Sequence, residues 1–218
     1  MIRAGIIGGA GYTAGELIRL LVNHPQVRLA FVHSTSNAGN RIADVHGGLE
    51  GDTELRFADT CDLASIDVLF LCSAHGESRK WLEANDVPAG VKIIDLAQDF
   101  RDESDGFVYG LPELNRDRIR TAERVANPGC FATAIQLALL PLAAAGLLTG
   151  EVHVTAVTGS TGAGVKPSAT THFSWRTDNI SVYKAFTHQH LIEIGRNLRR
   201  LQPCLLYTSP SPRDVEES

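Results

Sequence analysis

The chain has 218 residues, of which 44% are hydrophobic, and its formal net charge is −5. A chain of this length and composition can bury a sizeable core, which argues against disorder and predicts one domain plus part of a second. The charge is mild and carries no long single-sign blocks, so nucleic acid or an anionic membrane is not expected as the main partner. A small-molecule ligand fits this composition better.

No segment of the sequence resembles a targeting or membrane-spanning element. The N-terminus enters an apolar run that reaches glycines within a few residues, which leaves no room for a signal peptide. The most apolar stretch, residues 134–148, is shorter than the roughly 20 residues of a membrane-spanning helix. The four cysteines form neither a CxxC pair nor a cluster with histidines at metal-ligand spacing. We therefore expect a cytoplasmic protein without disulfides or bound metal.

The first half of the chain alternates short apolar runs with helical stretches, a pattern typical of βαβ units around a parallel sheet. Strands are expected at residues 5–7, 28–33, 68–72 and 91–96, with a helix over residues 14–23. The runs are continuously apolar, as expected when helices cover both faces of a sheet. The predicted fold class is α/β, with a Rossmann-type, doubly wound parallel sheet.

The pattern changes after Cys130. A helix is expected over residues 134–148, a strand over 151–157, a segment rich in glycine, serine and threonine over 158–164, and a helix over 189–201. A second domain is therefore predicted to begin near Cys130. The last fifteen residues, 204–218, are rich in serine and proline and show no periodicity. They fit either a flexible native tail or a non-native tail, and we favour the second.

A glycine-rich turn, Gly8-Gly9-Ala10-Gly11-Tyr12-Thr13-Ala14-Gly15, follows the first expected strand and opens the first expected helix. This is the context of a dinucleotide-binding turn. Glycine lets the backbone approach a pyrophosphate, whose charge then lies on N–H groups at the helix N-terminus. A tight turn without a ligand remains the alternative, but the position in the first βα unit favours a dinucleotide.

The end of the second expected strand indicates which dinucleotide binds. NAD enzymes usually carry an Asp or Glu there for the ribose 2′-hydroxyl. This chain has His33-Ser34-Thr35-Ser36-Asn37 instead. Hydroxyl and amide donors accommodate a 2′-phosphate that a carboxylate would repel, so NADP(H) is the predicted cofactor. Arg41 is the nearest obvious cation.

Cys130 is the strongest nucleophile candidate. Pro128 and Gly129 form a turn that places Cys130 at or near the start of a long helix, where the helix dipole and free N–H groups favour thiolate over thiol. That is how a cysteine becomes nucleophilic near neutral pH. The alternative is a structural cysteine, which is our interpretation of Cys61 and Cys72.

An acid–base candidate lies in His188-Gln189-His190-Leu191-Ile192-Glu193, because His190 and Glu193 at i, i+3 share one helix face. One histidine can exchange protons with a substrate carbonyl while the carboxylate orients its ring. The same residues also resemble half of a metal site, but no third ligand follows at suitable spacing. A solvated helix start is the main competing interpretation.

The small residues at 158–164 are consistent with a backbone nest for a phosphate or an oxyanion. A plain flexible loop is nearly as compatible with the spacing.

Seven segments of the chain, taken in order, resemble the N-acetyl-γ-glutamyl-phosphate reductase family of the semialdehyde dehydrogenase group. The segments that carry the resemblance, over residues 1 to about 203, are 8–17, 73–78, 95–101, 109–115, 127–130, 158–164 and 188–190. The chain departs from the family at Ala14, at Ala97-Gln98 and at Val165, where glycine, Ser-Ala and arginine are usual. Family members also continue well past this length, so the resemblance implies a C-terminally truncated chain.

The resemblance implies a reaction and a set of site residues. NADPH would reduce N-acetyl-γ-glutamyl phosphate to N-acetylglutamate semialdehyde and phosphate through a thioester on Cys130, a step of arginine biosynthesis. His190 would be the acid–base residue and Glu193 its partner. The cofactor would be held by Gly8, Gly11, Tyr12, Thr13, Ser34, Thr35 and Ser36, with Gly159 and Gly162 beside the cofactor and the substrate phosphate.

Residues 1–129 are accordingly expected to form the NADP-binding Rossmann domain, and residues 130–203 an incomplete α+β catalytic and substrate domain. The full-length form is expected to be a homo-oligomer. Two other functions stay open. One is aspartate-semialdehyde dehydrogenase, which shares the chemistry and the fold. The other is a non-catalytic NADP(H)-binding module, or an inactive fragment, in which Cys130 is structural or redox-sensing.

Overall fold

The computed structural model describes residues 1–203, so the expected non-native tail lies outside the described residues. The chain divides into two compact units. The first comprises Met1–Asn127 with Gly164–Lys166, and the second comprises Pro128–Ala163 with the described residues from Pro167 on.

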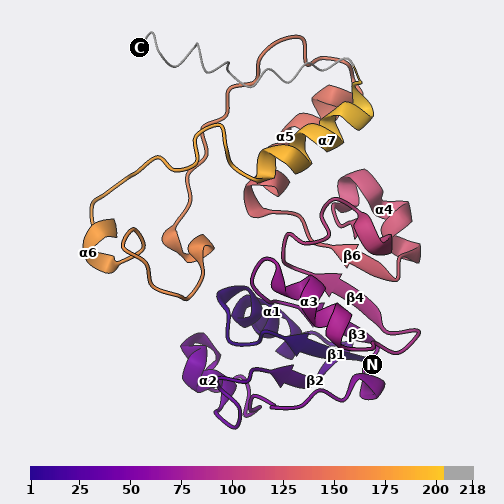
Figure 1. Cartoon of the computed structure of the whole chain (residues 1–218), viewed down its shortest axis with the longest axis vertical. Coiled ribbons are helices and arrows are strands. Elements are labelled where there is room, and N and C mark those ends of the chain that lie inside the picture. The colour runs from indigo at the N-terminus through magenta and orange to yellow at the C-terminus, as the bar shows by residue number, and fades with distance from the viewer. Residues whose placement is uncertain (204–218) are drawn as a thin grey trace. The chain divides into compact units, whose positions relative to one another are not determined.

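The first unit is built on a six-stranded parallel sheet in the order β2-β1-β3-β4-β6-β5 (Figure 1). The strands are β1 (Ile2–Ile7), β2 (Val27–His33), β3 (Val68–Leu71), β4 (Lys92–Asp95), β5 (Val108–Tyr109) and β6 (Arg124–Ala126). The chain pairs β1 with β2 on one side and then returns to place β3 on the other. A Rossmann-type parallel sheet is thus confirmed, and its strand order reverses at the carboxyl end of β1, where such sheets bind ligands.

Both faces of this sheet are covered. Successive residues of a strand point to opposite faces, so Ile6 and Ile7 enter two different cores. The Ile6 core includes Ala14 and Ile18 of α1 (Tyr12–Val22), whereas Trp81 packs from α3 (Glu77–Ala84) against the core that contains Ile7. The remaining helical segments of the first unit are α2 (Ile42–Val45), α4 (Pro112–Thr121) and the 3₁₀ turns η1 (Gly47–Leu49), η2 (Leu63–Ser65) and η3 (Ser104–Gly106).

The second unit is organised by two helices, α5 (Cys130–Ala144) and α7 (His190–Leu201), which pack side by side (Figure 1). A buried hydrogen bond joins them, because the Asn197 side-chain amide donates to Gln136 Oε1 at 2.7 Å. The short segments η4 (Ser160–Ala163) and α6 (Phe173–Arg176) lie between them in sequence. Within residues 1–203, no helix combines the length and the apolar composition needed to cross a bilayer.

The expected strand over residues 151–157 is wrong. The structure has no regular secondary structure there, and all seven residues are exposed. The alternation of valines with polar residues is a strand pattern, but a strand forms only when a neighbour completes its hydrogen-bond ladder. Among the described residues, no segment pairs with this one.

The helix expected over residues 134–148 lies four residues earlier than predicted. It begins at Cys130, and it ends in a glycine turn in which Gly146 adopts φ +69°. There Leu147 N donates to Leu142 O at 2.9 Å and Gly146 N donates to Ala143 O at 3.0 Å. This pattern is a Schellman motif, which glycine favours because it has no Cβ.

Candidate functional site

The glycine-rich turn of the first unit is closely packed against the sheet. Gly8 adopts φ +77°, and a Cβ there would lie 2.8 Å from the carbonyl oxygen of Cys72, the residue after β3. A Cβ on Gly9 would lie 2.3 Å from Val32 Cγ1 of β2. Both positions therefore require glycine, and the turn sits between the strands on either side of β1.

His46 also contacts this turn, an interaction that the sequence analysis missed. Its Nε2 lies 2.8 Å from Gly9 O, which can only accept, so Nε2 carries the proton. A Cβ on Gly15 would lie 2.6 Å from His46 Nδ1, and the ring also contacts Phe57 at 6.1 Å between centroids. No sequence signal marks this contact, because His46 lies 37 residues after Gly9.

The N-terminus of α1 is suited to bind an anion. Gly11 is its N-cap, Tyr12 and Thr13 are exposed in its first turn, and that turn contains no acidic residue. Neither a capping side chain nor a carboxylate competes there for the free backbone N–H groups. The close backbone approach at Gly8 and this uncapped helix end therefore fit a dinucleotide pyrophosphate.

The loop after β2 places its serines together. Ser34 is buried and its Oγ lies 3.4 Å from Ser36 Oγ, which also accepts a hydrogen bond from Asn37 Nδ2 at 3.1 Å. Thr35 is exposed. Arg41, the cation that the sequence suggested, faces carboxylates instead of this loop's hydroxyls.

Cys130 occupies the first position of α5 and is exposed, as the Pro128-Gly129 turn predicts. Gly129 is the N-cap residue of the helix, so the thiol lies at the positive end of the helix dipole. The other described cysteines lie in a different environment. Burial raises the pKa of Cys61, and burial together with the nearby Asp95 carboxylate raises the pKa of Cys72 to about 12.

His190 and Glu193 both lie in the first turn of α7 and are buried. His190 Nε2 lies 3.9 Å from Glu193 Oε1, and Glu193 Oε2 accepts a hydrogen bond from Gly129 N at 3.3 Å. A Cβ on Gly129 would lie only 2.2 Å from His190 Nε2. The structure therefore brings the imidazole and the carboxylate against the residue that precedes Cys130.

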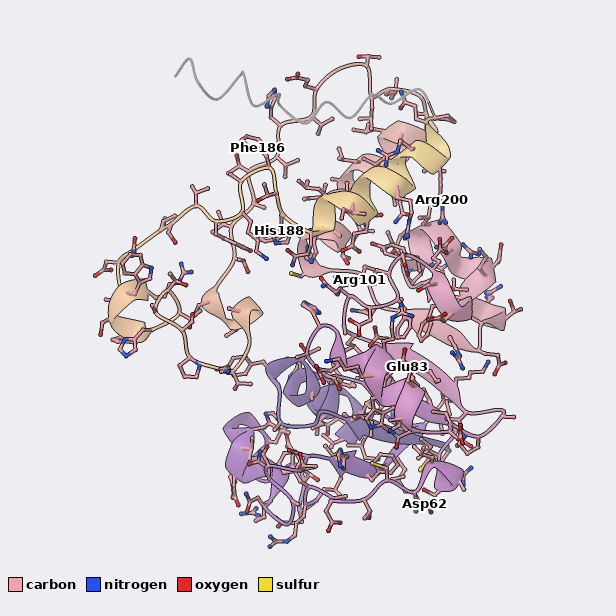
Figure 2. The ribbon with its side chains drawn as sticks, in the orientation of Figure 1. Asp62, Glu83, Arg101, Phe186, His188 and Arg200 are labelled. Atoms are coloured by element: carbon pink, nitrogen blue, oxygen red, sulfur yellow. The ribbon has the colours of Figure 1, made fainter. Side chains whose placement is uncertain are left out.

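Three further rings lie next to this pair; the sequence analysis named His188 only as part of the 188–193 run and did not assign Phe131 or Tyr183 to the site. Phe131 lies edge-on to His188 at 5.5 Å and to His190 at 6.2 Å, while Tyr183 contacts His188 at 5.8 Å between centroids. His188 precedes the first turn of α7 (Figure 2), and its Nδ1 accepts a hydrogen bond from His190 N at 3.2 Å. The position of Phe131 next to Cys130 in the sequence is the signal that could have found it.

Gly159 and Gly162 are not packed into this arrangement. Both are exposed, and a Cβ on either would meet no described atom within 4 Å. Among the described residues, no group of three His, Cys, Asp or Glu side chains is arranged to hold a metal ion.

Two family models match the sequence. The model described as "Semialdehyde dehydrogenase, NAD binding domain" matches residues 3–122. The model described as "Semialdehyde dehydrogenase, dimerisation domain" matches residues 130–209.

The curated relatives include proteins named N-acetyl-gamma-glutamyl-phosphate reductase. The protein of Bacteroides thetaiotaomicron is 65% identical over 204 residues, which cover 93% of this chain and 63% of the relative. The protein of Flavobacterium johnsoniae is 55% identical over 208 residues, covering 93% and 64%. The chain thus spans less than two thirds of the length of these relatives.

Solved structures share the fold. "Aspartate Semialdehyde Dehydrogenase with NADP from Candida albicans" matches with a TM-score of 0.55 at 18% identity, over 65% of this chain and 46% of that chain. The aspartate semialdehyde dehydrogenase of Francisella tularensis matches with a TM-score of 0.51 at 23% identity, over 65% and 40%.

Proposed function

The chain belongs to the semialdehyde dehydrogenase family, and from that premise we propose that it is an N-acetyl-gamma-glutamyl-phosphate reductase, acting in the NADPH-dependent reduction of N-acetyl-γ-glutamyl phosphate. The products are N-acetylglutamate semialdehyde and phosphate, in arginine biosynthesis. The support for this substrate is the 55–65% identity to relatives that carry the reductase name.

One observation carries the chemistry. Cys130 begins α5, and the residue before it, Gly129, contacts both His190 and Glu193. A nucleophile at a helix N-terminus beside a histidine–carboxylate pair is the arrangement that acyl transfer requires.

In the proposed mechanism, Cys130 attacks the acyl carbon as a thiolate. A C–S bond forms, and the C–O bond to the phosphate breaks, so that phosphate leaves with the electron pair. When bound, NADPH supplies the hydride that reduces the resulting thioester. His190 donates a proton to the developing alkoxide and takes it back as the C–S bond breaks, which releases the aldehyde and regenerates the thiolate. Glu193 orients the His190 ring and stabilises its protonated form.

The cofactor is proposed to lie along the carboxyl edge of the first unit's sheet. The turn and the start of α1 would hold the pyrophosphate, the loop after β2 would hold the 2′-phosphate, and the small residues after residue 157 would contact the nicotinamide end and the substrate phosphate. The residues so assigned are Gly8, Gly11, Tyr12, Thr13, Ser34, Thr35, Ser36, Gly159 and Gly162.

Two further expectations become proposals. The match of residues 130–209 to a dimerisation domain supports a homo-oligomer as the working form. An exposed thiol nucleophile such as Cys130 persists best in a reducing compartment, which supports the cytoplasm.

The test is run in the reverse direction with the 218-residue chain. NADP reduction is expected with N-acetylglutamate semialdehyde and phosphate together, and not with aspartate semialdehyde. Cys130→Ser is expected to lose this reaction, and mass spectrometry should find an acyl adduct on Cys130 that the serine variant lacks. A faster reaction with aspartate semialdehyde would overturn the substrate assignment. NADPH binding with neither turnover nor adduct would favour the non-catalytic module.

A further inference from the structure

We propose that Arg56, and not Arg41, is the residue that recognises the 2′-phosphate of NADP(H) and so sets the preference for this cofactor. The inference rests on the proposed cofactor site and names the residue that determines its specificity.

Arg41 is already neutralised by acidic side chains. Its guanidinium lies 3.4 Å from Glu54, 3.5 Å from Glu50 and 3.7 Å from Asp44. These carboxylates, Glu54 most strongly, raise the pKa of Arg41 above its usual value. A phosphate approaching Arg41 would meet three like charges, which makes it a poor phosphate-binding group.

Arg56 differs from Arg41 in the groups that it contacts. Its side chain is exposed, and Nη1 donates to Gly39 O, in the loop after β2, at 2.8 Å. Within residues 1–203, no carboxylate forms an ion pair with Arg56. A guanidinium has five N–H donors, so one anchoring bond holds the group over the loop and leaves the others for the two oxygens of a phosphate.

The backbone at Arg56 is fixed against the same loop. Gly39 N donates to Phe57 O at 2.9 Å and Phe57 N donates to Asn40 O at 3.0 Å, while Ser34 N donates to Ala58 O at 3.1 Å. Phe57 itself is buried in the core. The segment that carries Arg56 is therefore hydrogen-bonded to both ends of the loop.

The loop supplies a matching donor set. Ser34, Ser36 and Asn37 form one hydrogen-bonded cluster, and residues 34–40 contain no acidic side chain. A 2′-phosphate carries close to two negative charges and needs several donors beside a cation. In this fold the position at the end of β2 faces the 2′ group of the ribose. Arg56 completes that donor set.

The experiment measures equilibrium binding of NADPH and of NADH to the 218-residue chain and to three variants, R56Q, R56K and R41Q. R56Q is expected to weaken NADPH binding by roughly 10- to 100-fold, the range of charge-assisted hydrogen bonds, and to leave NADH binding unchanged. R56K keeps the positive charge but lacks the planar guanidinium that can donate two parallel hydrogen bonds to a phosphate, so it should retain part of the preference for NADPH over NADH. R41Q, the matched control, should change both affinities by the same factor.

Each other outcome overturns the inference. A wild-type preference for NADPH that survives in R56Q, or that is lost in R41Q alone, assigns the 2′-phosphate to another residue. An equal loss of NADPH and NADH binding in R56Q makes Arg56 a structural residue. A wild-type chain that binds neither nucleotide refutes the proposed cofactor, and the inference falls with it.

Discussion

The Glu193 carboxylate accepts a hydrogen bond from the backbone N–H of Gly129 at 3.3 Å and so ties the first turn of α7 to the residue before Cys130. The same carboxylate lies 3.9 Å from His190 Nε2. One buried side chain therefore fixes the helix start that carries the proposed nucleophile and faces the proposed acid–base residue. Glu193 thus has two roles, as the hydrogen-bond acceptor for Gly129 N and as the negative charge beside His190, and different substitutions can separate them.

Glu193→Gln should affect activity more than stability. The amide keeps an oxygen that can accept from Gly129 N, but it removes the negative charge that favours a protonated imidazole. The rate should fall by less than the roughly 10²–10⁴-fold that a general acid–base residue contributes, and the pH–rate profile should move to lower pH. The measurement is kcat as a function of pH.

Glu193→Ala is the matched comparison. It also removes the acceptor for the buried Gly129 N–H, which should lower the free energy of unfolding by about 1–3 kcal/mol. Equal unfolding midpoints for the two variants would contradict the hydrogen bond. An unshifted pH profile in Glu193→Gln would contradict the charge effect.

Gly129→Ala tests how closely His190 packs on the turn. The added methyl group would lie 2.2 Å from His190 Nε2, so the ring or the start of α5 must move. Overpacking of this kind costs about 1–3 kcal/mol of unfolding free energy, and turnover should fall with it. Gly150→Ala is the control, because a Cβ there meets no described atom within 4 Å. A urea midpoint for Gly129→Ala equal to that of the control would disprove the contact.

The sequence predicted the parts of the site that depend on local rules. The Pro128-Gly129 turn places Cys130 at a helix start because proline and glycine interrupt regular structure locally. The i, i+3 spacing of His190 and Glu193 is also a local rule, because residues three positions apart lie on the same face of an α-helix. The glycine-rich turn after β1 could be predicted because glycine is required where there is no room for a Cβ, as at Gly8 and Gly9.

What the sequence did not predict depends on long-range contacts. The 151–157 pattern is that of a strand, yet no described segment pairs with it, and pairing is not a local property. The engagement of Arg41 by Glu50 and Glu54, and the contact of His46 with Gly9, each join residues separated by 9 to 37 positions. Neither periodicity nor spacing encodes such neighbours.

His188 should make stability depend on pH. Burial is the larger cause that lowers the pKa of His188 below its ordinary value of 6.5, Lys184 adds to it, and Glu193 opposes both. Folding therefore favours neutral His188, whose Nδ1 can accept from His190 N. The contribution of neutral His188 to the free energy of unfolding is fully present above the pKa that this histidine has in the unfolded chain. It is lost as the pH falls through the lower pKa of His188 in the folded chain. Urea midpoints should decrease from about pH 7 to about pH 5.

The control for this effect is His188→Asn, whose side-chain oxygen can still accept from His190 N but cannot titrate in this range. The variant should show a shallower decrease of the urea midpoint over the same interval. Parallel curves for the wild-type chain and the variant would show that other groups cause the dependence.

The described cysteines should differ in their rates of alkylation by iodoacetamide at neutral pH. Cys130 is exposed at the start of α5, whereas burial raises the pKa of Cys61 and takes that of Cys72 to about 12. Each pKa unit above the working pH lowers the thiolate fraction tenfold, so Cys130 should react at least ~10²-fold faster than Cys72. Peptide mapping distinguishes these sites from Cys204, which lies outside the described residues. Equal labelling of Cys130 and Cys72 would remove the structural reason for assigning the nucleophile to Cys130.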